Sequence, residues 1–201
     1  MGLRVERRPG GPGGIRCFVA VDLAADVVAA IETVVAPIRQ VGGDVRWVAK
    51  ENLHVTLKFL GQISEARVDA VRAALSRCAK LRAPFEVTAM GLGAFPNQRR
   101  ARVVWVGLDG PELGALSCGV DEELAGEGFP REARATIPHI TIGRVRSPRG
   151  WERVLAAMRP YWENSFGKSR VDEIVLYRSD LRPEGPLYMA LERLPLDGSG
   201  Q

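Results

Sequence analysis

Two copies of one short strand-like pattern constrain the fold of this chain more than any other feature. Its only two histidines each open the pattern, as His54-Val55-Thr56-Leu57 and as His139-Ile140-Thr141-Ile142. In an extended strand alternate side chains point to the same face, so each histidine shares a polar face with its threonine. The aliphatic residues between them then face a core. The chain therefore has to hold two similar, half-buried strands that lie 85 residues apart in the sequence.

The first of these strands carries further expectations. Leu53, Val55, Leu57 and Phe59 are predicted to form its apolar face. Lys58 is predicted to share the polar face with His54 and Thr56, where it either contacts a phosphate or faces water.

Hydrophobic periodicity and turn residues predict strands and helices throughout the chain. Besides the second histidine strand, strands are predicted over residues 15–22, 45–48, 52–60, 85–91, 102–108, 169–177 and 186–193, and the segments 45–48 and 52–60 are expected to form a pair. Helices are predicted over residues 25–40, 64–80, 111–127 and 147–162, with Ser64 as the cap of the second.

Each half of the chain thus offers strands, helices and one histidine strand. We predict an α+β, bilobal, pseudo-symmetric fold in which two mostly antiparallel sheets, flanked by helices, lie around a central cleft. Similar lobes of this kind bring the two histidines together.

Composition sets the broad class. A 201-residue chain that is 46% hydrophobic fits a single domain, which we place at residues 15–196 between flexible tails at 1–14 and 197–201. A net charge of +4 favours a polyanionic partner, and no apolar run is long enough to span a membrane. Cys17, Cys78 and Cys118 are odd in number and lack metal-ligand spacing, which favours a reducing, cytoplasmic location.

The sequence lacks residues that several common classes of catalytic site require. It has no third histidine, no His-x-x-x-His helix and no cysteine cluster, so a catalytic metal is not expected. It also has no Gly-x-Ser-x-Gly elbow and no phosphate-binding loop of the Gly-x-x-x-x-Gly-Lys-Ser/Thr type. Two histidines without a metal suit phosphodiester chemistry, in which one imidazole accepts a proton and the other donates one. Thr56 and Thr141 would then donate hydrogen bonds to the non-bridging phosphate oxygens.

Longer matches surround both patterns. The segments Asn52 to Gly61 and Pro138 to Arg144 resemble the two signatures of the two-histidine phosphoesterases, and within that superfamily the chain resembles the RNA 2′,3′-cyclic phosphodiesterases, also called 2′-5′ RNA ligases. Supporting matches include Arg16 to Asp22, Arg46 to Val48, Gly91 to Pro96, Val104-Trp105 and Ser179 to Tyr188, so that the resemblance spans about residues 15–196. The second signature departs from the usual pattern at Ile142-Gly143, where Leu and Ala are common.

The resemblance implies a bilobal fold and opening of RNA 2′,3′-cyclic phosphate ends to 2′-phosphate ends, with no metal and no cofactor. It also implies that the reverse reaction, 2′-5′ RNA ligation, is open to the site. By the same resemblance His54 is the proton donor and His139 the proton acceptor, an assignment that the symmetric motifs alone leave open. The expected partner is RNA with 2′,3′-cyclic phosphate ends, tRNA halves among them, and the expected state is a monomer without membrane attachment.

Other residues are candidates for substrate binding, each with a structural alternative. Arg144 either contacts phosphate or ends a strand at the surface, and Phe18, Trp47 and Tyr188 either stack on a nucleobase or belong to the core. Four arginines lie in the two longest loops and either guide the RNA backbone or are merely solvated: Arg99, Arg100, Arg131 and Arg134.

Two alternatives to this function are a phosphodiesterase acting on another cyclic or 2′-5′-linked nucleotide, and a non-catalytic module that binds RNA ends. Binding alone does not require two matched His-x-Thr pairs, which argues against the second.

Overall fold

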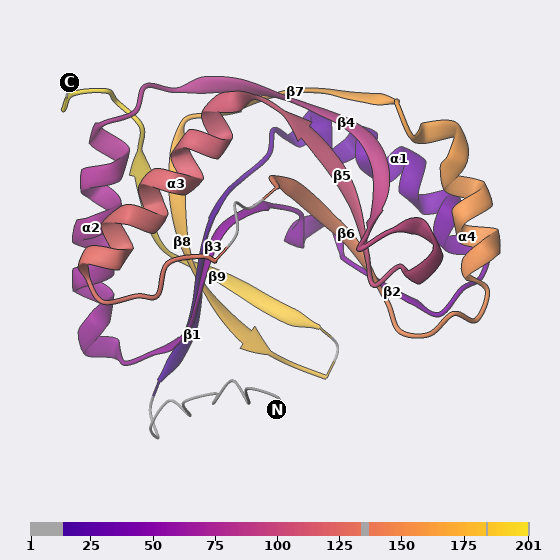
Figure 1. Cartoon of the computed structure of the whole chain (residues 1–201), viewed down its shortest axis with the longest axis horizontal. Coiled ribbons are helices and arrows are strands. Elements are labelled where there is room, and N and C mark those ends of the chain that lie inside the picture. The colour runs from indigo at the N-terminus through magenta and orange to yellow at the C-terminus, as the bar shows by residue number, and fades with distance from the viewer. Residues whose placement is uncertain (1–13, 134–136, 184, 201) are drawn as a thin grey trace.

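The structure is a computed structural model that describes residues 14–133, 137–183 and 185–200. In these residues nine strands form one antiparallel sheet and four helices pack against it (Figure 1). The strands are β1 (Ile15–Val21), β2 (Val45–Trp47), β3 (Val55–Ile63), β4 (Phe85–Phe95), β5 (Val103–Asp109), β6 (His139–Val145), β7 (Ser165–Val171), β8 (Glu173–Leu181) and β9 (Pro186–Pro195). The helices are α1 (Ala25–Gln40), α2 (Val68–Lys80), α3 (Pro111–Gly126) and α4 (Trp151–Met158).

The predicted α+β class with antiparallel strands is confirmed. The tail predicted at residues 1–14 lies, except for Gly14, outside the described residues. The domain boundaries therefore stay predictions.

The order of the strands mixes the two halves of the sequence. Neighbouring strands follow the order β7-β4-β5-β6-β3-β1-β8-β9, and β2 pairs with β6. One half of the sheet thus combines β1 and β3 with the C-terminal strands β8 and β9. The other half is built from β4 to β7 and β2. The pseudo-symmetric lobes are therefore not successive stretches of chain.

A single residue pair joins the two halves. Val55 at the start of β3 is the partner of Ile140 near the start of β6, and the described residues contain no other paired position between these strands. Each of the two residues directly follows a histidine. The junction of the halves therefore lies at the two His-x-Thr patterns, and it links the two predicted sheets into one curled sheet.

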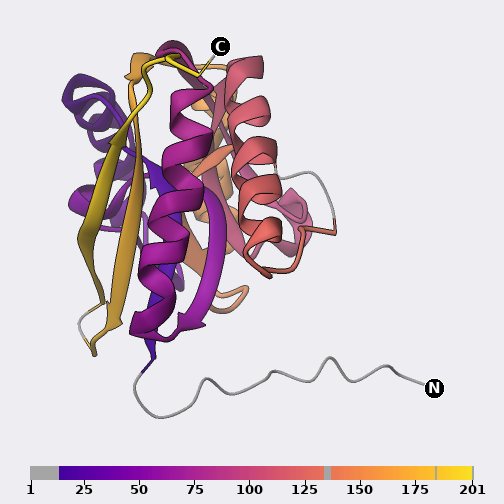
Figure 2. The same cartoon turned by 90° about the vertical axis from the view of Figure 1, so that its left-hand side faces the viewer.

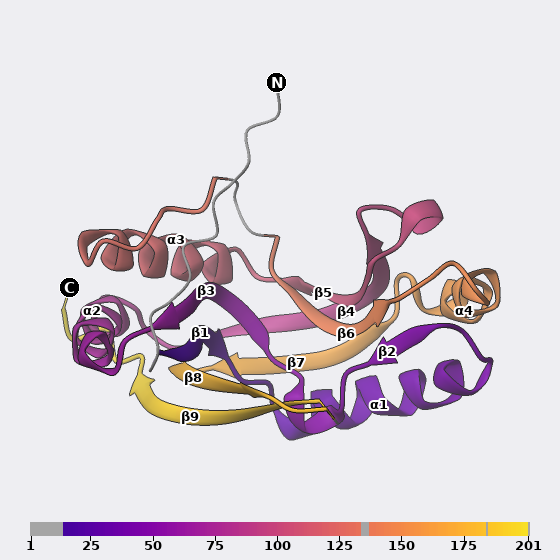
Figure 3. The same ribbon diagram turned by 90° about the horizontal axis from the view of Figure 1, so that it is seen from below.

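The helices cross between the halves. Helix α3 follows β5 but contacts β3 and α2, whereas α1 follows β1 but contacts β7 and α4. Figures 2 and 3 show the result: α2 and α3 lie at one end of the molecule, and α1 and α4 at the other. This exchange packs both halves into one continuous core.

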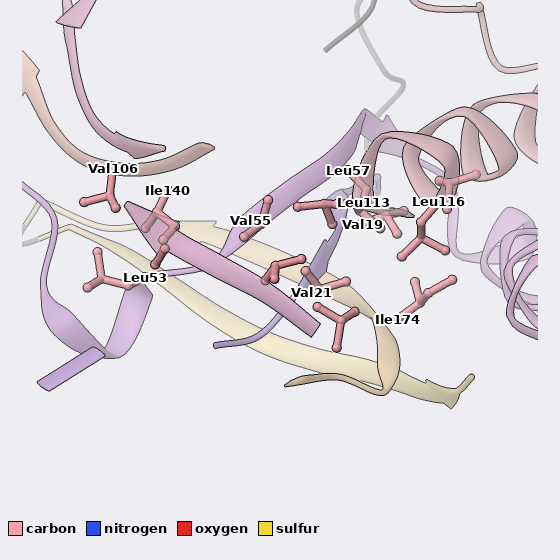
Figure 4. Packing of buried hydrophobic residues seen from close by; sticks show 14 of the residues in the cluster. Val19, Val21, Leu53, Val55, Leu57, Val106, Leu113, Leu116, Ile140 and Ile174 are labelled. Atoms are coloured by element: carbon pink, nitrogen blue, oxygen red, sulfur yellow. The ribbon is translucent and has the colours of Figure 1, made fainter. Parts of the chain in front are cut away.

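The core continues across the junction between β3 and β6. Val55 and Ile140 are fully buried and belong to the same cluster as Leu57 of β3 and Leu113 of α3 (Figure 4). Each fully buried aliphatic side chain of this size contributes on the order of 2 kcal/mol. The strand faces that carry these residues are fixed towards the helices, which leaves the opposite face for the histidines.

Three local predictions are wrong. Residues 169–177 are not one strand, because β7 ends at Val171 and β8 begins at Glu173; the sequence has no Gly or Pro at this corner to mark it. The segment around β2 pairs with β6 and not with β3. Ser64 makes no capping hydrogen bond through its side chain, and a short 3-10 turn, η2 (Glu65–Arg67), precedes α2.

Candidate active site

The two histidines flank the junction pair. His54 directly precedes Val55, and His139 directly precedes Ile140. In an antiparallel pair the residue before one partner stands opposite the residue after the other, so His54 faces Thr141 and His139 faces Thr56 across the strands. His54 and His139 are then diagonal neighbours, and such neighbours lie roughly 7–8 Å apart. A phosphate group fits between two imidazoles at such a separation.

Both imidazole rings are held in the same way. The Nδ1 atom of His54 lies 2.8 Å from the carbonyl oxygen of Asn52, and the Nδ1 atom of His139 lies 2.8 Å from the carbonyl oxygen of Ile137. A carbonyl oxygen only accepts hydrogen bonds, so we assign the proton to Nδ1 in both neutral rings. Each Nε2 atom is thereby left as the nitrogen that can accept or donate a proton in a reaction.

A threonine lies next to the reactive nitrogen of His54. The Nε2 atom of this ring is 3.1 Å from the Oγ1 atom of Thr56. The hydroxyl donates to the neutral ring and accepts from the protonated one, so it fits both states. Because Thr141 occupies the same position after His139, the two motifs supply two hydroxyl groups at the junction.

Burial changes the proton affinity of His54. Removal of the ring from water lowers its pKa below the usual value of 6.5, against the hydrogen bond to Asn52 and the charge of Asp22, which raise the pKa. The charges of Arg144 and His139 lower the pKa further. These two charges act on His54 from β6, which agrees with the close approach of the two motifs. In the free protein His54 is thus biased towards its neutral form.

A β-bulge follows each His-x-Thr pattern. On β3 the residues Thr56 and Lys58 pair with adjacent residues of β1, so that Leu57 is the extra residue. On β6 the residues Thr141 and Gly143 pair with adjacent residues of β5, so that Ile142 is the extra residue. Both bulges stand three residues after the histidine. A bulge shifts the alternation by one residue, so the fifth residue after each histidine faces the site.

These fifth residues are Phe59 and Arg144. The Phe59 side chain is 59% exposed and its ring centroid lies 6.2 Å from that of Phe18, so the prediction that it belongs to the apolar core face is wrong. Arg144 is also exposed, which both of its predicted alternatives allow, so its role in the site stays a prediction. Phe59 stands at the same distance from His54 as Arg144 does from His139, and this equal spacing was the sequence signal for Phe59. Strict alternation without a bulge assigns Phe59 to the wrong face.

The bulge also corrects the prediction for Lys58. This side chain is only 3% exposed and points to the face that the helices cover, where its ammonium group donates hydrogen bonds to the carboxylate of Asp121 and to the carbonyl oxygen of Pro130. Lys58 therefore neither shares the face of His54 nor meets solvent. It links β3 to α3 and to the loop that leads to β6.

Aromatic rings surround His54. Its ring centroid lies 4.9 Å from that of Phe18 and 5.3 Å from that of Tyr188, with the Tyr188 ring edge-on. Phe18 is only 3% exposed, which agrees with its alternative as a core residue, whereas Tyr188 is half-buried beside His54. Trp47 also packs against the core, and its ring lies directly over Gly143. His139 has an equivalent neighbour in Phe95, whose ring is edge-on at 5.1 Å.

Positive charge borders this aromatic group. Burial raises the pKa of the Tyr188 hydroxyl, whereas the charges of Arg144, Arg16 and Arg46 lower it. All three arginines are exposed, and Arg46 is the cross-strand partner of Arg144. Sequence reasoning did not single out Arg16 or Arg46 as site residues, although both lie in segments that resemble the family. Of the loop arginines, Arg134 lies outside the described residues.

Among the described residues, no group of three or more His, Cys, Asp or Glu side chains is arranged to hold a metal ion. No helix in the described ranges has the length and apolar character needed to cross a membrane.

The site is thus a pair of matched histidines with paired threonines on the helix-free face of a curled antiparallel sheet, the arrangement of a two-histidine phosphoesterase. The chain belongs to the LigT-like phosphoesterase family, whose model matches it twice, over residues 21–105 and 106–188. Each match contains one His-x-Thr pattern, so the repeat seen in the site is also a repeat of the family.

Relatives by sequence agree with this membership. The chain is 35% identical over 179 residues to a protein of Methanothermobacter thermautotrophicus named RNA 2′,3′-cyclic phosphodiesterase, covering 89% of this chain and 97% of the relative. An Archaeoglobus fulgidus protein of the same name is 36% identical, over 88% of this chain and 98% of the relative.

Solved structures share the fold. The Thermus thermophilus protein TT0787 superimposes with a TM-score of 0.74 at 30% identity, over 90% of this chain and 98% of that protein. Escherichia coli LigT in its apo form gives a TM-score of 0.74 at 28% identity, over 92% of this chain and 99% of LigT. A structure of LigT complexed with 3′-AMP gives a TM-score of 0.70 at 26% identity, over 91% of this chain and 98% of LigT.

Proposed function

We propose that the protein hydrolyses RNA 2′,3′-cyclic phosphate ends to 2′-phosphate ends by paired acid and base catalysis. One observation carries this proposal: both histidines lie at the same strand junction with Nδ1 held on a carbonyl oxygen, which leaves Nε2 of each ring as the nitrogen that can exchange a proton with a substrate. The names of the relatives and the family membership support the choice of substrate.

The proposed step needs only groups that the site provides. A water molecule attacks phosphorus and transfers a proton to the Nε2 atom of His139, while the bond from phosphorus to the 3′ oxygen breaks. The Nε2–H group of His54 donates its proton to that oxygen, which leaves a 3′ hydroxyl and a 2′ phosphate. The attacking and the leaving oxygen lie in line on opposite sides of phosphorus. Each of the two imidazoles, which stand at the starts of the neighbouring strands β3 and β6, then serves one of these oxygens. Thr56 and Thr141 donate to the equatorial oxygens, where charge develops.

The lowered pKa of His54 is compatible with a role as acid once substrate is bound. An anionic phosphate next to the ring favours its protonated form and therefore raises the pKa. The same reasoning applied to the free protein favours neutral His54. The direction of proton transfer proposed here, from His54 and to His139, rests on the family resemblance.

The surroundings of the two histidines suit RNA. The half-buried Tyr188 and the exposed Phe59 offer apolar ring surface for a nucleobase near His54, and the buried Phe18 packs against both rings from below. Arg144 and Arg46 offer positive charge for the phosphate and for the RNA backbone.

The test is incubation of the pure protein with an RNA that ends in a 2′,3′-cyclic phosphate, with and without EDTA. We expect a 2′-phosphate product at an unchanged rate in EDTA, and a loss of at least about 10³-fold in His54→Ala and in His139→Ala with the fold intact by circular dichroism. A 3′-phosphate product, inhibition by EDTA, or full activity in both variants would contradict the proposal.

The two alternative functions predict other outcomes of the same assay. A phosphodiesterase for another nucleotide turns over a cyclic mononucleotide or a 2′-5′ oligoadenylate faster than the RNA end. A binding module retains the RNA end without converting it between pH 5 and 9. The use of tRNA halves, the cytoplasmic location, the monomeric state and the reversal to 2′-5′ ligation stay predictions.

A further inference from the structure

A carboxylate faces His54 from the neighbouring strand β1. β1 and β3 pair with Val21 opposite Val55. Asp22 directly follows the first of these valines, and His54 directly precedes the second. Continuation of the antiparallel register by one residue therefore sets Asp22 opposite His54. Because both valines are buried in the core, alternation turns Asp22 and His54 to the same helix-free face. Directly opposed residues have Cβ atoms about 5 Å apart.

Two further strands hold this carboxylate in place. The hydroxyl group of Tyr177 on β8 donates a hydrogen bond to the carboxylate of Asp22, with its oxygen 2.7 Å from Oδ1 and 2.9 Å from Oδ2. Arg193 on β9 donates to Oδ2 at 3.0 Å and is shared with the carboxylate of Glu173. Two carboxylates and one guanidinium leave one negative charge uncompensated within this group.

Stacked rings connect the group to His54. The ring of Tyr177 stacks on Phe18, with centroids 5.3 Å apart and an angle of 18° between the planes. Phe18 in turn lies 4.9 Å from the imidazole of His54, and the centroids of Tyr177 and His54 are 6.4 Å apart. The hydrogen bond from Tyr177 therefore fixes the carboxylate relative to the rings that enclose His54.

Titratable groups face His54 from four strands, namely Asp22 of β1, His139 and Arg144 of β6, Tyr177 of β8 and Tyr188 of β9. Burial is the main cause of the lowered pKa of His54, and the charges of Arg144 and His139 lower it further. Among these groups of the described structure, Asp22 alone is anionic, and its charge raises the pKa of His54. Asp22 thus opposes the other charges that act on this ring.

We propose that Asp22 is a positioning residue of the reaction, whose carboxylate, held by Tyr177 and Arg193, favours the protonated form of His54 that donates a proton to the leaving oxygen. The inference rests on the proposed function, in which His54 is the proton donor. Asp22 acts through His54, by stabilising the charge of the imidazolium before the phosphate arrives.

This role predicts a particular dependence of the rate on pH. Without the carboxylate charge, His54 binds its proton less tightly. Above the titration midpoint of His54, each unit by which the pKa falls lowers the protonated fraction about tenfold. Well below the midpoint the ring is protonated in either case, and the rate does not change. The loss of activity should therefore grow as the pH rises.

The test compares Asp22→Asn with Glu173→Gln. Asn keeps the shape of the side chain and an oxygen that accepts the hydrogen bond from Tyr177, but it removes the charge. Glu173 pairs with the same arginine and loses the same charge, but it lies on β8, one strand further from β3. The midpoint of His54 in the free protein is measured by NMR, and kcat/KM for an RNA 2′,3′-cyclic phosphate end is measured from pH 5 to 9.

We expect Asp22→Asn to lower the midpoint of His54 by about 0.5 to 1 pH unit. The value of kcat/KM should fall about threefold to tenfold at pH 8, with a smaller loss at lower pH. Glu173→Gln should leave the midpoint within about 0.2 pH units and the rate within about twofold. Asp22→Ser also removes the charge and is measured in parallel, so that the test does not depend on the folding of one variant.

An unchanged or higher midpoint in the Asp22 variants, or an equal effect of Glu173→Gln, would overturn the role of Asp22 and leave the proposed hydrolysis intact. A loss of rate that is the same at every pH would also overturn it, because a merely structural contact gives that result. A wild-type protein that opens no cyclic ends would instead overturn the proposed function, and the role of Asp22 with it.

Discussion

At the residue scale, the environment of His54 sets its protonation. The ring is removed from water between Phe18 and Tyr188, and this burial is the main cause of its lowered pKa. When the pKa of a histidine is lower in the folded than in the unfolded state, the free energy of unfolding decreases as the pH falls through the pKa of the unfolded state. The reason is that the unfolded chain binds the proton more tightly. The same ring has to carry a proton in the proposed reaction.

We therefore predict that His54 titrates below pH 6.5 in the free protein and at a higher pH when a 2′-nucleotide product is bound. The chain has only two histidines, so ring NMR signals can be assigned by comparison with His54→Gln. A midpoint above 6.5 in the free protein would show that burial does not dominate. An unchanged midpoint on binding would show that the phosphate does not approach this ring.

A second prediction concerns the threonine hydroxyl groups. Thr56→Val keeps the shape of the side chain and removes the hydroxyl that lies 3.1 Å from His54 Nε2, so we expect kcat to fall on the order of 10²-fold. Thr56→Ser restores the hydroxyl and should recover most of the activity. Stopped assays on a cyclic phosphate end measure both. Equal kcat values in the two variants would argue that the methyl group, and not the hydroxyl, matters.

At the scale of secondary-structure elements, the two bulges decide which residues serve the site and which serve the core. After the bulge at Leu57, Lys58 turns towards α3 and Phe59 turns towards the histidines. Burial raises the pKa of Asp121, but hydrogen bonds from Lys58 and Glu132 outweigh it and hold that pKa below its usual value. The pair thus contributes stability that is lost as the pH falls through this lowered pKa.

Replacement of Lys58 should show how much this link between β3 and α3 contributes to the free energy of unfolding. We predict that Lys58→Met destabilises the protein by about 2 kcal/mol, since it leaves the partly buried carboxylate of Asp121 without its lysine partner. Lys168→Met, which breaks the exposed pair with Glu86, should change stability by less than about 0.5 kcal/mol. Urea denaturation of both variants gives the comparison. Equal effects would mean that the Lys58 pair behaves as a surface pair.

At the scale of the whole molecule, one residue pair joins the two halves of the sheet and also places the two histidines. Ile140 and Ile174 are both fully buried, but only Ile140 lies at the junction with β3. We predict that both Ile140→Ala and Ile174→Ala cost about 2–5 kcal/mol of stability. Only Ile140→Ala should also lower kcat, about tenfold, because it loosens the distance between the histidine strands.

Thermal denaturation and turnover well below the midpoint measure these two effects separately. If both variants lose stability and keep the same kcat, the junction is not needed for the geometry of the site. If Ile174→Ala loses as much kcat as Ile140→Ala, the loss reflects general loosening of the core.

The sequence by itself determined the local elements and the two reactive patterns. Alternation placed His54 and Thr56 together, and the aliphatic residues between them fixed the opposite face to the core. Helical periodicity placed α1 and α3 to within one residue at their ends. These features depend on neighbours along the chain, so periodicity and turn residues are sufficient to predict them.

Only the tertiary structure decided the rest. The pairing of β2 with β6, the exchange of α1 and α3 between the halves, and the single Val55–Ile140 contact join residues that are far apart in the sequence. The bulges that turn Lys58 inward and Phe59 outward arise from the register with neighbouring strands, which alternation within one strand does not specify. A hollow lined by Gly93, Trp105 and Trp162 likewise forms because the edge of β4, the loop before β5 and the segment before β7 meet there. Such features are set by the packing of distant segments, and a chain read residue by residue contains no local signal for them.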